Sequence, residues 1–213
     1  MLNIIIGRRS NLSMHLNNAL DDCLLISSQN LLFELNQINW KNIDCVNLIL
    51  NHFHPAHNLN NISSPEEYIN NSIVSTSRVL QFFKKRNTLI NKIIYSSSSS
   101  VYGQNEFCLE TDTPMPLSLP ASLKLANEYL VQKFCNEENI NYVLTRIFNM
   151  YGGNDQFSII SKLINAINNK KEIYLINNGS AVRDFIHISD VVNAYKILLE
   201  KSPLPPIINI ATG

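Results

Sequence analysis

Charge is scarce in this sequence, and neither sign is in excess. Charged residues make up 16% of the 213 residues, and 17 lysines and arginines balance 17 acidic side chains. A neutral chain gives no electrostatic reason to expect nucleic acid or an acidic membrane surface as a partner. The sequence also lacks an apolar run long enough to cross a bilayer, so we expect no membrane partner.

Cysteine pairs with redox or metal-binding spacing are missing as well. The four cysteines are scattered without a CxxC motif, at Cys23, Cys45, Cys108 and Cys135. The N-terminus has a short apolar run with no basic segment before it, which indicates a first strand and not a signal peptide. Both features predict a reduced, cytoplasmic chain with buried thiols.

A cluster of histidines raises the question of a metal site. His52, His54 and His57 stand within six residues, a spacing that is compatible with metal ligands. No Asp, Glu or Cys joins them locally, and Pro55 interrupts the group. We therefore interpret this stretch as a surface loop near the ligand edge of a sheet and predict no metal ion.

One apolar run ends abruptly in serine, and it organises the rest of the chain. Ile93 to Tyr95 is predicted to be a buried strand, and five serines follow at 96–100. Residues that follow a parallel strand lie at the carboxyl edge of the sheet, where open α/β sheets bind ligands. A Ser-rich linker is the alternative, but apolar residues flank both sides. The alternation of strands and helices predicts an α/β fold with a doubly wound parallel sheet.

The other elements are predicted from apolar periodicity and turn residues. We expect further strands at 2–6, 23–26, 45–50, 141–148, 173–176 and 207–210. Helices are expected at 14–20, 31–38, 64–85, 157–167 and 191–199, with Asp190 as the cap of the last one.

The N-terminal segment has the order strand, glycine turn and helix, which opens many dinucleotide-binding domains. Gly7 begins the turn, and Ser27 follows the strand at 23–26. A site that prefers NAD usually has a carboxylate at the end of this second strand, and none stands there. Arg8 and Arg9 then either attract the 2′-phosphate of NADP or are merely solvated loop charges.

These segments, taken in order, resemble the extended short-chain dehydrogenase/reductase family of nucleotide-sugar epimerases, dehydratases and reductases. The likeness rests on the serines at 96–100, on Lys124 in its helix, and on the stretches 146–153 and 183–192. It implies a Rossmann-like dinucleotide-binding domain over residues 1–150 and a truncated substrate-binding region over residues 151–213. It also implies a helix over residues 118–129, which carries Lys124, and a homodimer that packs through this helix.

The resemblance implies specific roles for site residues. The cofactor, NAD or NADP, would contact Gly7, Arg8, Arg9, Ser10, Ser13, Ser27, Ser96 and Lys124. The catalytic candidates are Ser98 and Lys124. The nucleotide-sugar substrate would contact Tyr102, Asn149 and Arg183, although a structural ion pair between Arg183 and Asp190 is the alternative for that arginine.

The chain also departs from the family pattern. Ser10 and Ser13 stand where the family has its second and third glycines, so binding of the cofactor is expected to be weak or lost. Pro120 stands where the family has the tyrosine that moves a proton to or from the sugar hydroxyl. Tyr95, Tyr102 or a histidine of the 52–57 loop would have to replace it.

Two functions remain open on these residues. The first is an NAD(P)-dependent epimerase or reductase acting at C4 of a sugar nucleotide in surface-polysaccharide synthesis. The second is a catalytically inactive relative that serves as a binding or partner subunit, because several losses affect the same chemistry.

Overall fold

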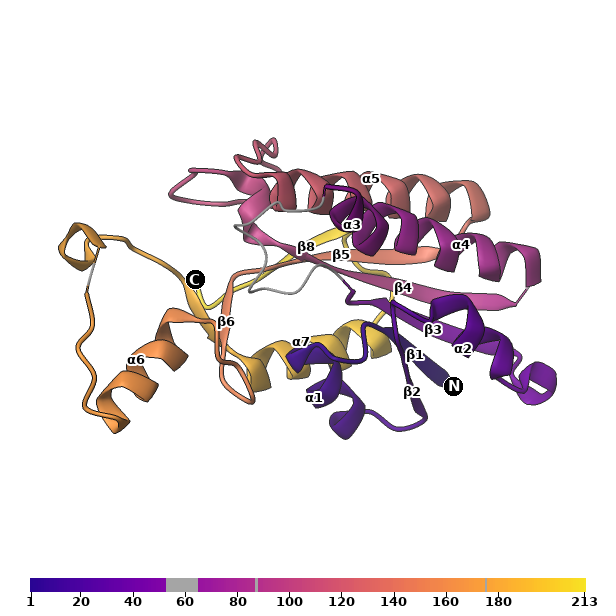
Figure 1. Ribbon diagram of the computed structural model, residues 1–213. Coiled ribbons are helices and arrows are strands. Elements are labelled where there is room, and N and C mark those ends of the chain that lie inside the picture. Colours follow the sequence, from indigo (N-terminus) through magenta and orange to yellow (C-terminus); the bar gives the residue numbers. More distant parts are fainter. Residues whose placement is uncertain (53–64, 87, 175) are drawn as a thin grey trace.

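A parallel β-sheet forms the centre of the computed structural model, which describes residues 1–52, 65–86, 88–174 and 176–213 (Figure 1). Within these residues the sheet has six strands in the order β2-β1-β3-β4-β5-β8, and all neighbouring strands are parallel. The strands are β1 (Leu2–Ile6), β2 (Cys23–Ile26), β3 (Cys45–Leu50), β4 (Leu89–Ser98), β5 (Asn141–Ile147) and β8 (Ile207–Ile210). The predicted α/β fold is therefore confirmed.

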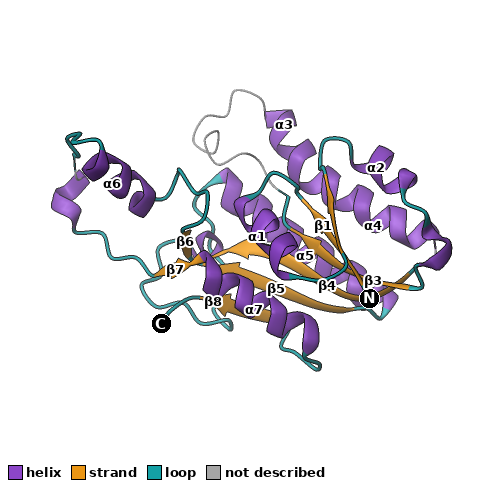
Figure 2. Ribbon diagram, turned by 90° about the horizontal axis from the view of Figure 1, so that it is seen from below, coloured by secondary structure: helices purple, strands orange, loops and turns teal. Residues whose placement is uncertain are grey.

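Helices cover both faces of this sheet (Figures 1 and 2). One face carries α2 (Leu31–Gln37), α3 (Pro65–Ile69), α4 (Ser75–Arg86) and α5 (Leu119–Glu138), and a π-helical turn (Asn70–Val74) joins α3 to α4. The other face carries α1 (Asn11–Ala19) and α7 (Ile188–Glu200). Among the described residues, no helix combines the length and apolar character needed to span a bilayer.

Each face of the sheet has its own apolar core, because side chains alternate along a strand. In β4, Ile93 and Tyr95 belong to the same core as Phe83 of α4, whereas Ile94 belongs to the core that contains Tyr195 of α7. All three β4 residues are fully buried. A strand that is buried on both faces needs a continuous apolar run, which is why the run at 93–95 was informative.

The serines lie at the carboxyl edge of the sheet, as expected. β4 pairs with β3 on one side and with β5 on the other, and its strand geometry continues through Ser98. A 3₁₀ turn (Ser99–Tyr102) follows at once, so the stretch is not a linker.

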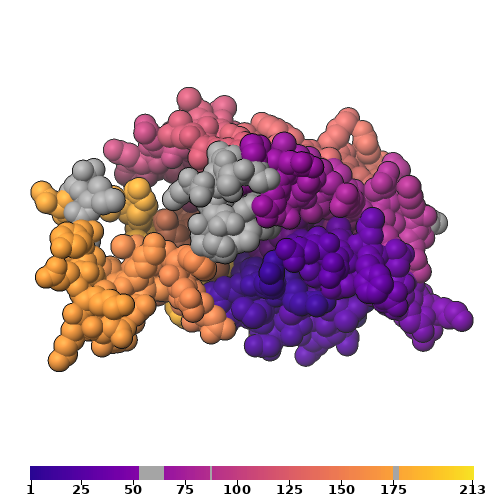
Figure 3. All heavy atoms as spheres, viewed as in Figure 1, coloured from indigo at the N-terminus to yellow at the C-terminus, as the bar shows by residue number. Residues whose placement is uncertain are grey.

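The chain between β5 and α7 forms a smaller lobe at one end of the molecule (Figure 3), whereas α7 and β8 belong to the central sheet and its cover. It contains a short parallel pair, β6 (Asn149–Tyr151) with β7 (Phe185–His187), and the amphipathic helix α6 (Ile159–Asn168), none of whose residues is fully buried. The strand predicted at 173–176 is wrong: Ile173 and Tyr174 have no strand geometry, and a 3₁₀ turn (Ile176–Gly179) follows. The predicted cap Asp190 is also wrong, because α7 begins earlier and His187 is its N-cap.

A buried lysine joins the sheet to α7. Lys92 lies in β4 with 3% of its surface exposed, and its Nζ donates to the carbonyl oxygens of Leu198 (2.5 Å) and Lys201 (2.6 Å). These carbonyls belong to the end of α7, where helix groups lack partners within the helix. Lys92 therefore fixes the C-terminus of α7 against the sheet, and burial lowers its pKa.

Candidate functional site

The candidate site lies where the direction of strand addition reverses. The chain passes from β1 outward to β2 and then places β3 on the other side of β1. In open α/β sheets, ligands bind at the carboxyl ends of the strands at this point. Here the two segments that meet are the turn after β1, which begins at Gly7, and the residues after β3, Asn51 and His52.

Gly7 is required by the close approach of these two segments. Its φ is +114°, and a Cβ atom on it would lie 2.4 Å from the backbone oxygen of Asn51. The Asn51 backbone N–H donates to the Ile6 carbonyl (2.9 Å), which holds the two segments together. The predicted role of Gly7 in a tight turn is thus met by the geometry.

The side-chain amide of Asn51 donates hydrogen bonds to Ser10 and Ser13, the two serines that stand at the family's glycine positions. The Nδ2 of Asn51 donates to Ser10 Oγ (2.8 Å) and to Ser13 Oγ (2.9 Å), and Ser13 is fully buried. Ser10 is also the N-cap of α1. The hydroxyls are therefore held toward the end of β3. The sequence did not reveal this contact, because 38–41 residues separate the partners.

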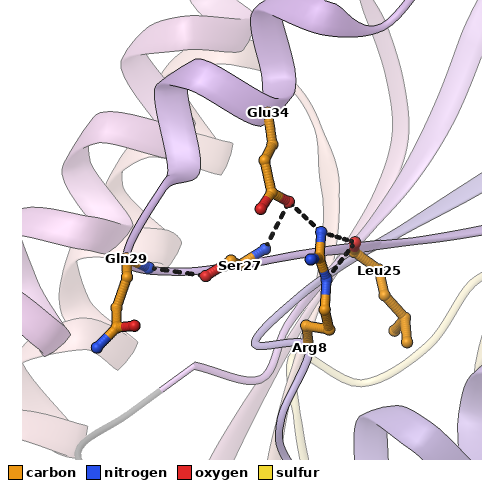
Figure 4. Close-up of polar contacts among 5 residues, drawn as sticks. All are labelled: Arg8, Leu25, Ser27, Gln29 and Glu34. Carbon is orange, nitrogen blue, oxygen red and sulfur yellow. Dashed lines mark hydrogen bonds and ion pairs between the residues drawn. The ribbon is translucent and has the colours of Figure 1, made fainter.

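A carboxylate does stand at the end of β2, contrary to the expectation from the sequence. Glu34, in α2, accepts a hydrogen bond from the Ser27 backbone N–H (3.0 Å) and pairs with the Arg8 guanidinium (Figure 4). Arg8 also donates from Nε (3.2 Å) and Nη2 (3.1 Å) to the Leu25 carbonyl. The Arg8 guanidinium is thus engaged with Glu34 and with Leu25 although its side chain is 49% exposed, and Arg9 is exposed as well.

The serines of β4 face different directions. Ser96 is buried and shares a hydrogen bond with the Tyr195 hydroxyl of α7 (2.6 Å), while Ser97 donates to Glu128 of α5. Only Ser98 of these three is partly exposed, and it accepts a hydrogen bond from the Ser100 N–H (3.2 Å). The Ser96 hydroxyl is thus engaged with Tyr195, and its contact with a cofactor stays a prediction.

Helix α5 brings Lys124 to the end of β4. Its Nζ donates to the carbonyl oxygen of Ser96 (2.6 Å) and lies 5.1 Å from the centre of the Tyr95 ring. Ser118 caps the helix, so Pro120 falls in the first turn, where a missing N–H breaks no helical hydrogen bond. The helix is intact, but its first turn presents no phenol.

Neither tyrosine proposed as a substitute acid is accessible. Tyr95 is fully buried and Tyr102 is 1% exposed, and burial raises the pKa of both. The Tyr102 hydroxyl donates to Asn209 Oδ1 (2.7 Å), and its contact with a substrate stays a prediction. Lys124 and Ser98 are partly exposed polar groups at this edge of β4.

The histidine loop is described only in part. His52 is buried rather than on the surface, and its Nε2 lies 3.0 Å from Thr76 Oγ1. Burial and nearby Lys124 lower the pKa of His52 to about 4, so it is neutral near pH 7. His54 and His57 lie outside the described residues. Within the described part of the chain, no group of three His, Cys, Asp or Glu side chains could hold a metal.

A buried ion pair lies beside these serines and was not predicted. Arg146 of β5 donates from Nε to Glu128 Oε1 (3.2 Å) and from Nη2 to Glu128 Oε2 (2.8 Å). The two side chains are 2% and 3% exposed. The guanidinium also stacks over the ring of Tyr102 at 4.7 Å. The pair joins α5 to β5 beneath the candidate site.

The predicted substrate residues lie on the smaller lobe. Asn149 donates through Nδ2 to the Asp184 carbonyl (2.8 Å), which joins β6 to the segment before β7. Arg183 is exposed, and the described residues contain no ion pair between it and Asp190, so that alternative is wrong. The Asp184 carboxylate instead accepts hydrogen bonds from the backbone N–H groups of Thr212 (3.0 Å) and Gly213 (2.9 Å).

These residues fit the adenosine half of a dinucleotide. The Gly7 turn leads into the N-terminus of α1, whose free N–H groups favour an anion, and Glu34 places a carboxylate oxygen at the end of β2. Lys124 and Ser98 lie farther along the same edge of the sheet. The catalytic half departs from the family pattern at Pro120.

We expect Lys124 to make stability depend on pH. Burial lowers the pKa of its amine from 10.5 to about 7, and Glu128 partly offsets this. Between about pH 7 and pH 10 the unfolded chain therefore binds more protons than the folded one, and stability rises with pH. Replacing Lys124 with methionine should remove this rise.

Urea unfolding at pH 6.5 and pH 9 checks the prediction. The unfolding free energy of the natural protein, relative to that of Lys124→Met, should be higher at pH 9 than at pH 6.5. Lys162→Met, at an exposed position of α6, serves as the control and should show no such shift. An equal pH dependence for Lys124→Met and the natural protein would contradict the burial of this amine.

Comparison with known sequences shows the family. The profile of the "NAD dependent epimerase/dehydratase family" matches residues 11–211. Protein CapI of Staphylococcus aureus is 34% identical over 149 residues, which cover 68% of this chain and 44% of that protein. The dTDP-D-glucose 4,6-dehydratase of Dictyostelium discoideum is 28% identical over 167 residues, which cover 72% of this chain and 38% of that enzyme. The chain thus spans less than half the length of these curated relatives.

Comparison with solved structures agrees. The UDP-glucuronic acid 4-epimerase of Bacillus cereus, solved with UDP-glucuronic acid and NAD, has a TM-score of 0.82 and 22% identity. The match covers 100% of this chain and 78% of that chain. At this identity the likeness shows the Rossmann-like fold alone. Because the family profile extends over most of the residues, the chain belongs to the NAD-dependent epimerase/dehydratase family.

Proposed function

We propose that this chain binds NAD and a nucleotide sugar, and acts at C4 of the sugar in surface-polysaccharide synthesis. One observation carries the proposal: the Gly7 turn, Ser98 and Lys124 lie along the carboxyl edge of one parallel sheet. A dinucleotide that spans this edge has its pyrophosphate over the turn and its reactive ring toward β4. We propose residues 1–150 as the cofactor domain and residues 151–213 as part of the substrate region.

The smaller lobe offers space for the sugar nucleotide. A cavity of about 420 Å³ lies between β6, β7 and α6, lined among others by Tyr151, Ser161 and His187. Asn11 of α1 donates to the Gly152 carbonyl (2.9 Å) and accepts from the Asn154 N–H (3.0 Å). This links the cavity to the start of α1, beside the proposed pyrophosphate position.

The chemistry would divide between cofactor and protein. Bound NAD supplies a hydride acceptor for C4 of the sugar. Ser98 would hydrogen-bond the reacting oxygen, and Lys124, whose pKa is about 7, would hold the ribose and exchange the proton that the missing phenol would otherwise move. Arg183, which is exposed, would bind the diphosphate.

A second function is favoured by Pro120 and by the contact of Asn51 with Ser10 and Ser13. Pro120 removes the usual acid/base. Ser10 and Ser13, held by Asn51, place side chains where the family has glycine. Together they support a subunit that binds a nucleotide sugar without turning it over. For either function we propose a homodimer that packs through α5. The free cysteines suit a reducing compartment such as the cytoplasm.

We expect turnover by the natural protein to be slow. Loss of a positioned general acid lowers rates by about 10²–10⁴-fold. Pro120→Tyr restores a phenol one helical turn before Lys124 and should raise the rate without reaching that of an ordinary enzyme, because Ser10 and Ser13 remain. The measurement is 4-epimerisation of UDP-glucuronic acid and of UDP-glucose with added NAD, followed by chromatography of the sugar nucleotides.

A neighbouring variant controls for the position of the phenol. Leu119→Tyr adds the same group one residue away, at a side chain that is already 36% exposed, and should leave the rate unchanged. Fast turnover by the natural protein would show that an acid is already in place. No turnover by any variant, with UDP-glucuronic acid still bound in a calorimetric titration, would instead favour the binding subunit.

A further inference from the structure

Glu34 occupies an unusual place for a helix residue, because its carboxylate reaches the end of a neighbouring strand. Figure 4 shows the side chain extending from α2 toward Ser27 and Arg8. One oxygen, Oε2, receives both the Ser27 N–H (3.0 Å) and the Arg8 guanidinium. The other oxygen, Oε1, has no hydrogen bond within the described part of the chain, and the side chain is 18% exposed.

The carboxylate lies directly beside the turn that would hold a pyrophosphate. β1 and β2 pair in register from Asn3 with Cys23 to Ile6 with Ile26. Beyond the strands, the backbone N–H groups of Gly7 (2.9 Å) and Arg8 (3.2 Å) both donate to the Ile26 carbonyl. Ser27, which holds Glu34, is thus adjacent to the first residues of the turn. When pyrophosphate lies over such a turn, the adenosine ribose lies at the end of the second strand.

We propose that Glu34 binds the ribose hydroxyls of the cofactor and selects NAD over NADP. The proposal rests on the proposed function, since it assumes a dinucleotide at this edge of the sheet. The open oxygen Oε1 can accept a hydrogen bond from a ribose hydroxyl. A 2′-phosphate would remove that donor and bring negative charge against the carboxylate. The family usually takes this carboxylate from the strand end, whereas this chain takes it from α2.

Arg8 is a positioning residue for Glu34. Its guanidinium donates twice to the Leu25 carbonyl and once to Glu34, so it cannot turn toward a 2′-phosphate without losing these hydrogen bonds. The positive charge of Arg8 is thereby paired with Glu34. Arg9 is the other cation of the turn and is exposed. It is the group that would bind the 2′-phosphate of NADP. The selectivity is therefore measured with Arg9 unchanged.

Titration of NAD and NADP in the absence of any sugar nucleotide tests the proposal. The natural protein should bind NAD at least tenfold more tightly than NADP. Glu34→Gln keeps the shape but removes the charge, and should lower the ratio of the two affinities by about 10–100-fold, the range for a charge-assisted hydrogen bond. Glu34→Asp keeps the charge on a shorter side chain, and should weaken NAD while still excluding NADP. The readout is calorimetric or fluorescence titration, with thermal unfolding to verify that each variant is folded.

Glu137→Gln is the matched control. Glu137 is likewise a glutamate in an ion pair, with Lys133 at 3.1 Å, but its side chain is 55% exposed and it lies on α5. It should leave the ratio unchanged. An unchanged ratio in Glu34→Gln, equal binding of NAD and NADP by the natural protein, or binding of neither, would each overturn the proposal. Absence of sugar turnover would contradict only the proposed function, because the ratio is measured without the sugar.

Discussion

Replacing Arg146 with methionine is expected to lower the free energy of unfolding by about 3–5 kcal/mol. The substitution leaves the carboxylate of Glu128 buried without its cation, and Glu128 is only 3% exposed. Removing one partner of a buried ion pair is far more damaging than losing a surface pair, because the remaining charge has neither water nor a counter-ion. The guanidinium packing on Tyr102, at 4.7 Å, is lost as well.

Replacing both partners separates the pair from the isolated charge. Arg146→Met combined with Glu128→Leu should recover most of the lost stability, because apolar side chains of similar volume often match a buried ion pair. Lys133→Met is the control: this lysine also pairs with a glutamate at 3.1 Å, but it is 77% exposed, and its loss should change stability by about 0.5 kcal/mol or less.

Urea unfolding followed by circular dichroism gives these free energies. The explanation fails if Arg146→Met alone loses less than about 1 kcal/mol, or if the double variant is no more stable than the single one.

The second large effect is expected at Gly7. Gly7→Ala should destabilise the protein by about 2–5 kcal/mol, through an alanine at positive φ and through overlap with a neighbouring strand. The Cβ atom would lie 2.4 Å from the oxygen and 2.8 Å from the carbon of the Asn51 carbonyl group. Both atoms belong to the backbone after β3, so a side-chain rotation cannot relieve the overlap.

Gly213 offers a matched control, because its φ is +93° and nothing lies within 4 Å of a Cβ atom placed on it. Gly213→Ala should cost about 1 kcal/mol or less, which measures the backbone preference without the overlap. Thermal unfolding of the two variants gives the comparison. An equal effect for Gly7→Ala and Gly213→Ala would show that the close approach of β1 and β3 does not constrain position 7.

Several features of the fold could be predicted from the sequence because they depend on local patterns. The buried strand at 93–95 and the glycine turn after the first strand follow from apolar runs and turn residues. The helix that carries Lys124 follows from the family resemblance, which places it at 118–129, and the structure extends it to Glu138. The position of the serines at the carboxyl edge could also be inferred. A parallel strand is buried on both faces and is therefore apolar, so polar residues that follow it mark the edge of the sheet. The absence of a phenol at Pro120 needed no structure at all.

Two predictions were wrong where the local pattern did not decide the structure. In one case a predicted strand had no neighbouring strand, and in the other a different residue took the predicted helix-cap position. The apolar residues at 173–174 suit a strand, but they lie in the smaller lobe, where the described two-stranded sheet contains only β6 and β7. A strand needs a neighbour for its hydrogen bonds, and this segment has none there. Asp190 could have capped a helix that begins at residue 191, but α7 begins at Ile188 and His187 takes the cap position.

The content of the candidate site was decided by tertiary structure. Glu34 reaches Ser27 only because α2 packs back onto the sheet, so a carboxylate seven residues after Ser27 in sequence becomes its neighbour in space. Asn51 meets Ser10 and Ser13 across about 40 residues, and Arg146 meets Glu128 across 18. Periodicity reports which face of its own element a side chain occupies, whereas such contacts depend on how the elements pack. The sequence by itself therefore determined the family and the missing acid, and the packing of α2 and α5 on the sheet decided which charges stand at the site.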